Sequence, residues 1–304
     1  MQNTSNILMI RPVHFTYNAE TAVNNLFQVA NSAEKAQEKA LQEFDAFVEK
    51  LKANKIDVTV VNDTAEPHTP DSVFPNNWIS FHNNGTIILY PMYAENRRAE
   101  RKEHVIEKVN AKFQISQTID LTGYENENIF LEGTGSMVLD RENKIAYACV
   151  SPRTNLQVLS EFCKKMNYTS CTFTASDSNA NEIYHTNVMM CVADKYVVIC
   201  LDSVMEETER EKVKQVIVKS RKEIIDITFE QMNHFAGNML QLENTKGEKL
   251  LIMSTQAFQS LTEAQIQKLK EYNRILYTDL NTIETNGGGS ARCMIAEVFL
   301  HEKS

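Results

Sequence analysis

The sequence has few of the residues that build flexible linkers between domains. Its 304 residues include only nine glycines and six prolines, and no stretch is rich in proline, serine and glycine together or of low complexity. Such stretches commonly connect independently folded domains. We therefore expect residues 1–304 to form a single domain.

The chain also lacks a basic block and a long apolar run. Its formal net charge is −9, which argues against nucleic acid or an anionic membrane as the main partner. No apolar stretch approaches the roughly 20 residues of a membrane-spanning helix. The segment Met1–Ile10 has no basic start and only a short apolar run, so we do not expect it to act as a signal peptide. These features together predict a cytoplasmic protein with a small-molecule partner.

Motifs for structural metals and cofactors are absent as well. The six cysteines show no CxxC or CxxH spacing, and the seven histidines form no HExxH motif. Most of the cysteines sit in apolar segments, as free cysteines of cytosolic proteins do. We expect no metal site and no cofactor.

The elements that the sequence does predict follow one another in a repeating order. A first strand at residues 7–10 precedes an amphipathic helix at 33–52 and a β-branched strand at 57–61. Strands at 78–81 and 86–90 are joined through Asn83-Asn84-Gly85, a strong hairpin signal. Further helices are expected at 99–112, 156–166, 207–218 and 262–272, and a buried strand at 294–300 ends the series.

The helix centres recur about every 54 residues, which is typical of a repeat or propeller architecture. Five units of three strands and a helix predict an α/β fold in the form of a closed five-bladed propeller. Its strands would lie inside and its helices outside, with pseudo-fivefold symmetry. In such a ring the loops at one end converge on the axis, so polar residues far apart in sequence would meet there.

Four polar or glycine-rich stretches stand beside apolar strands and are candidates for that meeting point. They are Asp71–Trp78, Phe130–Met137, Ile183–Met190 and Asn286–Met294. The last contains three consecutive glycines and then Cys293; glycine allows positive φ and close approach of the backbone to a ligand. A glycine loop that delivers a thiol to the start of a buried strand can present a nucleophile to a pocket.

Each candidate residue has an ordinary structural explanation when it is taken alone. Glu132 could cap a turn, His185 could be a satisfied half-buried histidine, and Asn76-Asn77 could be turn residues. Cys293 could be a core cysteine next to a loose turn. Together, the order Glu132, His185, Cys293, each at a strand edge, suggests an orienting carboxylate, a general acid/base and a thiol nucleophile.

These residues resemble the guanidine-modifying enzymes of the pentein fold: arginine deiminases, dimethylarginine dimethylaminohydrolases and amidinotransferases. The resemblance covers almost the whole chain. It rests further on Pro70–Phe74, Asn96–Glu100 and Ser151–Asn155, which look like segments of the dimethylarginine hydrolases. It is closest to the citrulline-utilisation hydrolase branch, through Phe74–Trp78 and Gly287–Met294.

The resemblance implies a five-bladed propeller and places Glu132, His185 and Cys293 at the family's catalytic positions. It also implies that Asp71 and Phe74 belong to the substrate loop, and that Asp71 binds the substrate's amino end or NH groups. Arg97 and Arg153 are candidates for the substrate α-carboxylate, because a bidentate arginine suits a carboxylate; either could instead form a surface ion pair. A homodimer is common in the family, although nothing in this sequence shows an interface.

Asn76 and Asn77 depart from the family, whose classical members have acidic residues there. Two carboxylates suit a guanidinium cation, in which every NH group is a donor. A ureido group is neutral and has one acceptor oxygen, and an aspartate facing that oxygen in a buried site would cost roughly 1–3 kcal/mol. Asparagine can donate to the oxygen and accept from the NH2, so the departure permits citrulline as substrate.

The expected reaction is hydrolysis of the ureido group of citrulline to ornithine, ammonia and CO2 through a covalent Cys293 intermediate. An arginine deiminase, an arginine dihydrolase and an amidinotransferase are alternatives, because the covalent step is shared. A binding protein on the same fold is a further alternative, against which the Glu132, His185, Cys293 set argues. Arg292 could help the thiol to ionise or could be exposed, and Asn238 is interpreted as a structural turn residue.

Overall fold

The computed structural model describes residues 1–25, 27–29 and 35–303. Within them, fifteen strands form five sheets of three strands each. The sheets are β15-β1-β2 (Ala296–Glu297, Asn6–Arg11, Asp57–Asn62), β3-β4-β5 (Ile79–Phe81, Thr86–Leu89, Gln117–Asp120), β6-β7-β8 (Val138–Asp140, Ile145–Cys149, Thr169–Phe173), β9-β10-β11 (Met190–Val192, Tyr196–Ile199, Glu223–Asp226) and β12-β13-β14 (Leu240–Glu243, Lys249–Ser254, Arg274–Thr278).

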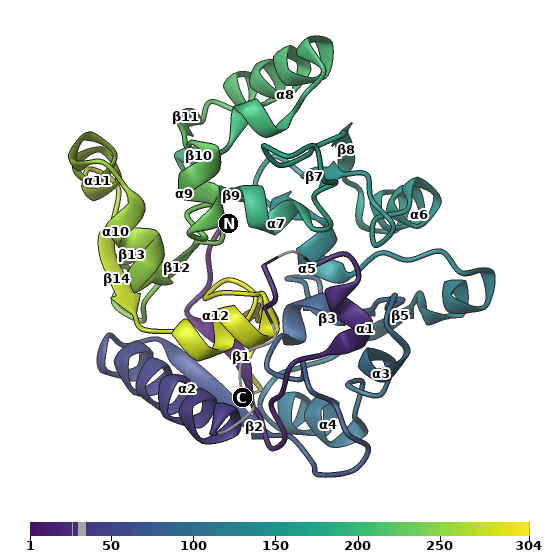
Figure 1. The fold of residues 1–304 in the computed structure, drawn as a ribbon. Helices are drawn as coiled ribbons and strands as arrows, with labels where there is room; N and C mark the ends of the chain where they lie inside the picture. Colours follow the sequence, from purple (N-terminus) through teal and green to yellow (C-terminus); the bar gives the residue numbers. More distant parts are fainter. Residues whose placement is uncertain (26, 30–34, 304) are drawn as a thin grey trace.

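All five sheets share one connectivity. The middle strand pairs antiparallel with one neighbour and parallel with the other, as β4 does with β3 and β5. Because a parallel pair needs a long crossover, a helix lies between the two parallel strands of each sheet. These helices are α2 (Ala36–Ala53), α4 (Glu103–Lys112), α6 (Leu156–Met166), α8 (Glu207–Lys219) and α11 (Glu263–Lys270). Figure 1 shows them around the outside of the ring, with the strands nearer its centre, which confirms the expected five-unit α/β-propeller.

The two ends of the described chain meet in one sheet and complete the ring. β15 pairs antiparallel with β1, with Ile7 opposite Glu297 and Leu8 opposite Ala296. The expected strand at 294–300 is therefore too long, since only Ala296–Glu297 pairs in the sheet. The rest of that run is apolar because it is buried between two core clusters, not because it belongs to a sheet.

The expected helix at 99–112 is wrong in its first turn. The structure has a short α3 (Glu95–Arg98), then an irregular segment, and α4 begins only at Glu103. The side chains of the intervening segment hold other parts of the chain: Arg101 makes two hydrogen bonds to Glu125, at 2.7 and 2.9 Å, and Lys102 pairs with Asp63. These tertiary contacts override the local preference for helix.

The other expected elements agree with the structure to within a few residues. The hairpin is present, and Gly85 has a φ of 79°, which glycine tolerates without strain. The helices at 156–166, 207–218 and 262–272 correspond to α6, α8 and α11. The helix expected at 33–52 corresponds to α2; its first residues, 33–34, lie outside the described residues.

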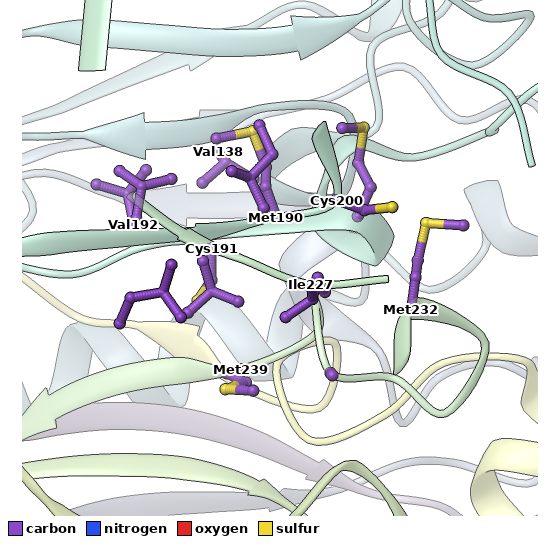
Figure 2. Packing of buried hydrophobic residues seen from close by; sticks show 14 of the residues in the cluster. Val138, Met190, Cys191, Val192, Cys200, Ile227, Met232 and Met239 are labelled. Carbon is purple, nitrogen blue, oxygen red and sulfur yellow. The ribbon is translucent and has the colours of Figure 1, made fainter. Parts of the chain in front are cut away.

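Most of the cysteines are packing residues. In the largest core cluster, Cys191 of β9 lies on the opposite side of its strand from Met190 and Val192, near Met239 (Figure 2). Burial raises the pKa of the Cys191 thiol to about 12 and that of Cys200 to about 11. Such thiols behave as small apolar side chains.

Short helical turns come just before the inner strands of several sheets. The turn η1 (Pro75–Asn77) precedes β3, α5 (Gly133–Ser136) precedes β6, and α7 (Thr186–Met189) precedes β9. The remaining short helices are α1 (Ala19–Ala22), η2 (Thr122–Glu127), η3 (Leu201–Ser203), α9 (Phe229–Asn233), α10 (Thr255–Ser260) and α12 (Asn281–Gly287). Since α5 packs against both η1 and α7, residues from different repeats are brought together near the axis.

Among the described residues, no helix is both long enough and apolar enough to cross a membrane.

Candidate active site

A small chamber near the axis is lined by residues from four of the five repeats, each of which contains one sheet. Its walls include Cys293, His185, Asp71, Phe74, Asn77, Arg97 and Arg153, and the free volume is about 10 Å³. This is about the space of one water molecule, so entry of an amino acid requires part of the wall to move. Glu132 lies behind His185, whereas Asn76 is not part of the wall.

The glycine loop can bring the Cys293 thiol to the chamber because its glycines have no side chains. Larger residues at these positions would collide with their neighbours. A Cβ on Gly287 would lie 2.7 Å from the ring of Phe74, and one on Gly289 would lie 3.2 Å from the Cβ of Cys293. The loop therefore packs directly against Phe74. The close approach that the three glycines predicted is present.

Two side-chain amides donate to the Cys293 sulfur. Asn238 Nδ2 lies 3.2 Å from it and Asn187 Nδ2 lies 3.4 Å from it. The orientation of Asn238 is determined by its neighbours, since its Oδ1 accepts from the backbone N–H of Arg292 and its Nδ2 also donates to the backbone oxygen of Asn187. Asn238 thus shapes the turn, as expected, and also contacts the sulfur, which sequence reasoning missed.

The guanidinium of Arg292 forms its hydrogen bonds with groups other than the Cys293 thiol. Its Nη1 donates to the backbone oxygen of Ile295 at 2.9 Å, and its Nη2 pairs with Glu297 at 3.1 Å. It is buried, so the exposed arginine considered from the sequence is wrong. The groups that touch the sulfur are neutral amides.

His185 is paired with the buried Glu132. Its Nε2 lies 2.8 Å from Glu132 Oε2, and since a carboxylate only accepts, Nε2 carries the proton. Burial lowers the pKa of His185 to about 4, although Glu132 opposes the shift. The imidazole is therefore neutral near pH 7, and its Nδ1 is free to accept a proton.

Glu132 is held as an anion despite being fully buried. Burial alone would raise its pKa, but Arg153 and then His185 hold the pKa of this carboxyl well below its usual range. Its Oε1 accepts from the backbone N–H of Tyr93 at 2.9 Å. The carboxylate thus fixes the direction of the imidazole ring.

The two candidate arginines are buried in the wall and already have partners. Arg97 is bound to Glu100, Asn77 and the backbone oxygen of Phe74. Arg153 donates to Asn24 and to the backbone oxygen of Thr21, and its Nη1 lies 3.5 Å from Glu132. Neither arginine belongs to a surface ion pair.

Asp71 and Asn77 each present one unpaired polar atom. Asp71 Oδ2 accepts from Asn18 and Thr21, while its Oδ1 has no partner among the described residues. Asn77 Oδ1 accepts a hydrogen bond from Arg97 Nη1 at 2.9 Å, whereas Asn77 Nδ2 has no hydrogen-bond partner among the described residues. Burial raises the pKa of Asp71, opposed chiefly by Arg97.

An N-terminal segment forms the remaining wall, and sequence reasoning missed it. The backbone oxygen of Thr21 accepts from Arg153, and Asn25 Nδ2 donates to the backbone oxygen of Gly288 at 3.4 Å. Gln28 Nε2 donates to the backbone oxygen of Asn286 at 2.7 Å. This segment has no strong hydrophobic period, and its polar side chains act through partners that are distant in sequence.

The ring of five α/β units, with a thiol, an imidazole and a carboxylate at its axis, defines a pentein of the guanidine-modifying class. A sequence model of the family described as N,N dimethylarginine dimethylhydrolase, eukaryotic, matches residues 11–300. The chain belongs to this family. A search among curated proteins found no match.

Solved structures with the same fold include arginine-converting enzymes. The chain is 19% identical to the substrate-bound N-terminal domain of ArgZ, an arginine dihydrolase from the ornithine-ammonia cycle in cyanobacteria, with a TM-score of 0.75 over 97% of this chain and 99% of that domain. It is 15% identical to a dimethylarginine dimethylaminohydrolase bound to S-methyl-L-thiocitrulline, with a TM-score of 0.68 over 97% of this chain and 99% of the other. It covers only 42% of full-length ArgZ.

Proposed function

We propose that this protein is a cysteine-dependent hydrolase of the ureido group of citrulline. The observation that carries the proposal is the orientation of the Asn77 amide. Arg97 occupies its oxygen, so an unpaired N–H of Nδ2 is left in the wall of the chamber. An acceptor on the substrate satisfies it; a ureido group has such an oxygen, and a guanidinium group has none.

An acceptor in the same wall complements this donor. Asp71 Oδ1 is buried and has no partner among the described residues. We assign this oxygen to the amino end or the NH groups of the substrate. Asn187 is not part of the wall and acts through the Cys293 sulfur, to which its Nδ2 donates.

The rest of the substrate is assigned to the other walls of the chamber. Phe74 packs along the alkyl chain. Arg153 takes the α-carboxylate through Nη1, which makes no hydrogen bond to the described residues and lies 3.5 Å from Glu132. A guanidinium N–H can donate a charge-assisted hydrogen bond to a carboxylate oxygen.

The reaction has two stages around one sulfur. His185 Nδ1 takes the proton of the Cys293 thiol, and the thiolate, stabilised by the amides of Asn187 and Asn238, attacks the ureido carbon while the Asn77 N–H stabilises the developing oxyanion. His185 then passes that proton to the ureido NH2 as its C–N bond breaks, so ammonia leaves and a thiocarbamate joins the sulfur to the ornithine moiety.

His185 then takes a proton from water, which attacks the same carbon and breaks the C–S bond. The product is a carbamate, which loses CO2 to give ornithine, and Cys293 is restored. Glu132 keeps the imidazole in the orientation and tautomer that both proton transfers need.

Arginine is the second candidate, and the charge of the site favours it. Three buried carboxylates, Asp71, Glu100 and Glu132, face two guanidinium groups, Arg97 and Arg153. Fully ionised, this cluster has one negative charge in excess and attracts a cation, although burial raises the pKa of Glu100 to about 7 and so reduces the excess. An arginine dihydrolase, as ArgZ is described, would carry arginine through the same chamber; an arginine deiminase or an amidinotransferase would share the covalent step.

The proposal is tested by trapping the covalent stage. Enzyme mixed with citrulline is quenched in acid and analysed by mass spectrometry, with Cys293→Ala as the control variant. We expect the peptide containing Cys293 to gain the mass of citrulline less ammonia. Absence of this adduct, together with an adduct from arginine, would support the second candidate instead.

A further inference from the structure

A hydrogen bond between Glu284 and Ser290 closes the glycine loop that precedes Cys293. Glu284 lies in α12, and its Oε1 accepts from the Ser290 hydroxyl at 2.5 Å. Its other carboxyl oxygen accepts from the side-chain amide of Gln256. Glu284 is 1% exposed and Ser290 is fully buried, so water does not compete for these bonds. The two residues stand on either side of the glycines at 287–289 and join the two ends of that run.

The run of glycines needs such a closure. Glycine has more backbone freedom than any other residue and loses the most on folding, and here three glycines follow one another. They line the chamber, whereas neither Glu284 nor Ser290 belongs to its wall. The bond between Glu284 and Ser290 therefore holds the loop from outside the chamber.

Ser290 transmits its position to the nucleophile. Its backbone oxygen accepts from the backbone N–H of Cys293 at 2.9 Å and from that of Met294 at 3.3 Å. Ser290 thus begins the turn that carries the thiol. The Cys293 sulfur lies 3.2 Å from the amide of Asn238 and 3.4 Å from that of Asn187, so a small rotation of the turn would change both contacts.

Packing alone does not explain a carboxyl group at residue 284. Burying an acid costs free energy that an apolar side chain of similar length would not, and the hydrogen-bond partners of this acid, Ser290 and Gln256, are both neutral. A neutral carboxyl group still has a carbonyl oxygen that accepts from a hydroxyl. The bond to Ser290 is therefore available whether Glu284 is ionised or protonated.

We propose that Glu284 is a positioning residue for the nucleophile. Through the Ser290 hydroxyl it fixes the glycine loop, and with it the place of the Cys293 sulfur against the amides of Asn187 and Asn238. The proposal rests on the proposed function, since it takes Cys293 as the nucleophile. It holds for citrulline and for arginine alike, because the covalent step uses the same sulfur.

Two substitutions, alone and combined, test whether Glu284 acts through Ser290. Glu284→Met keeps an unbranched side chain and removes the acceptor, and Ser290→Ala removes the donor. Each should lower kcat for citrulline about tenfold or more, with a smaller change in KM, because misplacement of a reacting group is costly. The double variant should be no slower than the slower single variant, since the second change removes no further contact. Losses that multiply, or an unchanged kcat in either single variant, would overturn the proposal.

A conservative variant provides the rescue. Glu284→Gln keeps an oxygen for the Ser290 hydroxyl, and the partly buried amide of Gln256 can turn to meet the new NH2. This variant should therefore retain most of the kcat that Glu284→Met loses. A loss as large as that of Glu284→Met would overturn the role of the hydrogen bond. Should Glu284→Met fail to fold, Ser290→Ala bears the same prediction.

Glu43→Gln is the control for an effect of stability. Glu43 lies on α2 and accepts from the backbone N–H groups of Thr282 and Ile283 at 2.8 and 3.0 Å, at the start of α12. The change weakens the end of the same helix and leaves the bond to Ser290 in place. It should lower the Tm without lowering kcat. If it lowered kcat as much as Glu284→Met does, stability and not positioning would explain both.

Alkylation of Cys293 tests the positioning role without a substrate. The residue is 7% exposed, so iodoacetamide reaches its thiol when the loop opens; the rate is followed by mass spectrometry of the peptide that contains it. Loss of the hydrogen bond should speed the reaction about tenfold in Glu284→Met and in Ser290→Ala, and not in Glu43→Gln.

These rates separate the two proposals. If the wild-type protein turns over neither citrulline nor arginine, the proposed function fails, and the alkylation rates still decide the role of Glu284. Faster alkylation in both variants supports the positioning role, and equal rates in the wild type and both variants overturn it.

Discussion

Replacing Asn77 by aspartate exchanges one N–H donor for an acceptor while the side chain keeps its size. Arg97 Nη1, 2.9 Å from the oxygen that remains in place, would keep the new carboxylate ionised. The second oxygen would take the position of Nδ2 in the chamber. A citrulline oxygen would then face an anion, and an arginine NH2 would face an acceptor.

The size of the effect follows from the two roles of that N–H. Opposing two acceptors in a buried site costs about 1–3 kcal/mol when the substrate binds. Loss of a donor to an oxyanion costs about 3–4 kcal/mol in the transition state. The kcat/KM for citrulline should therefore fall by a factor of about 10² to 10³, while that for arginine should stay level or rise.

The assay compares ornithine formed from each substrate at equal enzyme concentration. Asn76→Asp is the control, because Asn76 is fully buried yet is not part of the chamber wall. That variant should lower the Tm and leave the citrulline-to-arginine ratio unchanged. An unchanged ratio in Asn77→Asp, or an equal shift in Asn76→Asp, would refute the reasoning.

Three further outcomes follow from the same contacts. Cys293→Ser should reduce turnover at least about a thousandfold with little change in Tm, as measured by product assay and calorimetry. Gly135→Ala should lower kcat strongly, because its Cβ would lie 2.3 Å from Asn77 Nδ2 and would displace the amide; unchanged kinetics would mean that the position of this amide does not matter for turnover. Burial raises the pKa of Glu284 to about 7 from 4.5, so the folded state binds this proton more tightly; the stability that this group contributes is fully present below about pH 4.5 and is lost as the pH rises through 7. Glu284→Gln should therefore lose less Tm than the wild-type protein between pH 5 and 8 in thermal melts, and an identical decline in both would contradict this.

The fold was predictable because its signals are local and repeated. Each crossover helix, such as α6 or α8, has its own amphipathic pattern, and their even spacing indicates the ring without knowledge of any contact. The strand at 294–300 was overestimated because an apolar run reports burial and not pairing. The helix at 99–112 was overestimated because the roles of Arg101 and Lys102 depend on residues that are distant in sequence.

The candidate site was predictable in outline and not in its connections. Glu132, His185 and Cys293 each stand at the end of a recognisable element, and the structure places Glu132 and His185 in direct contact. Packing determines which atoms of Arg97 and Asn77 face each other. The sequence could therefore suggest that both residues lie near the substrate, but it could not show what each of them binds.

Ornithine formation from citrulline is the measurement that tests the central claim most directly. Purified protein is given citrulline or arginine separately, and ornithine, citrulline and ammonia are quantified, with Cys293→Ala as control. The account predicts that citrulline is converted to ornithine and ammonia well above the rate for arginine, and that the variant is inactive. Rapid arginine turnover with no conversion of citrulline would contradict it.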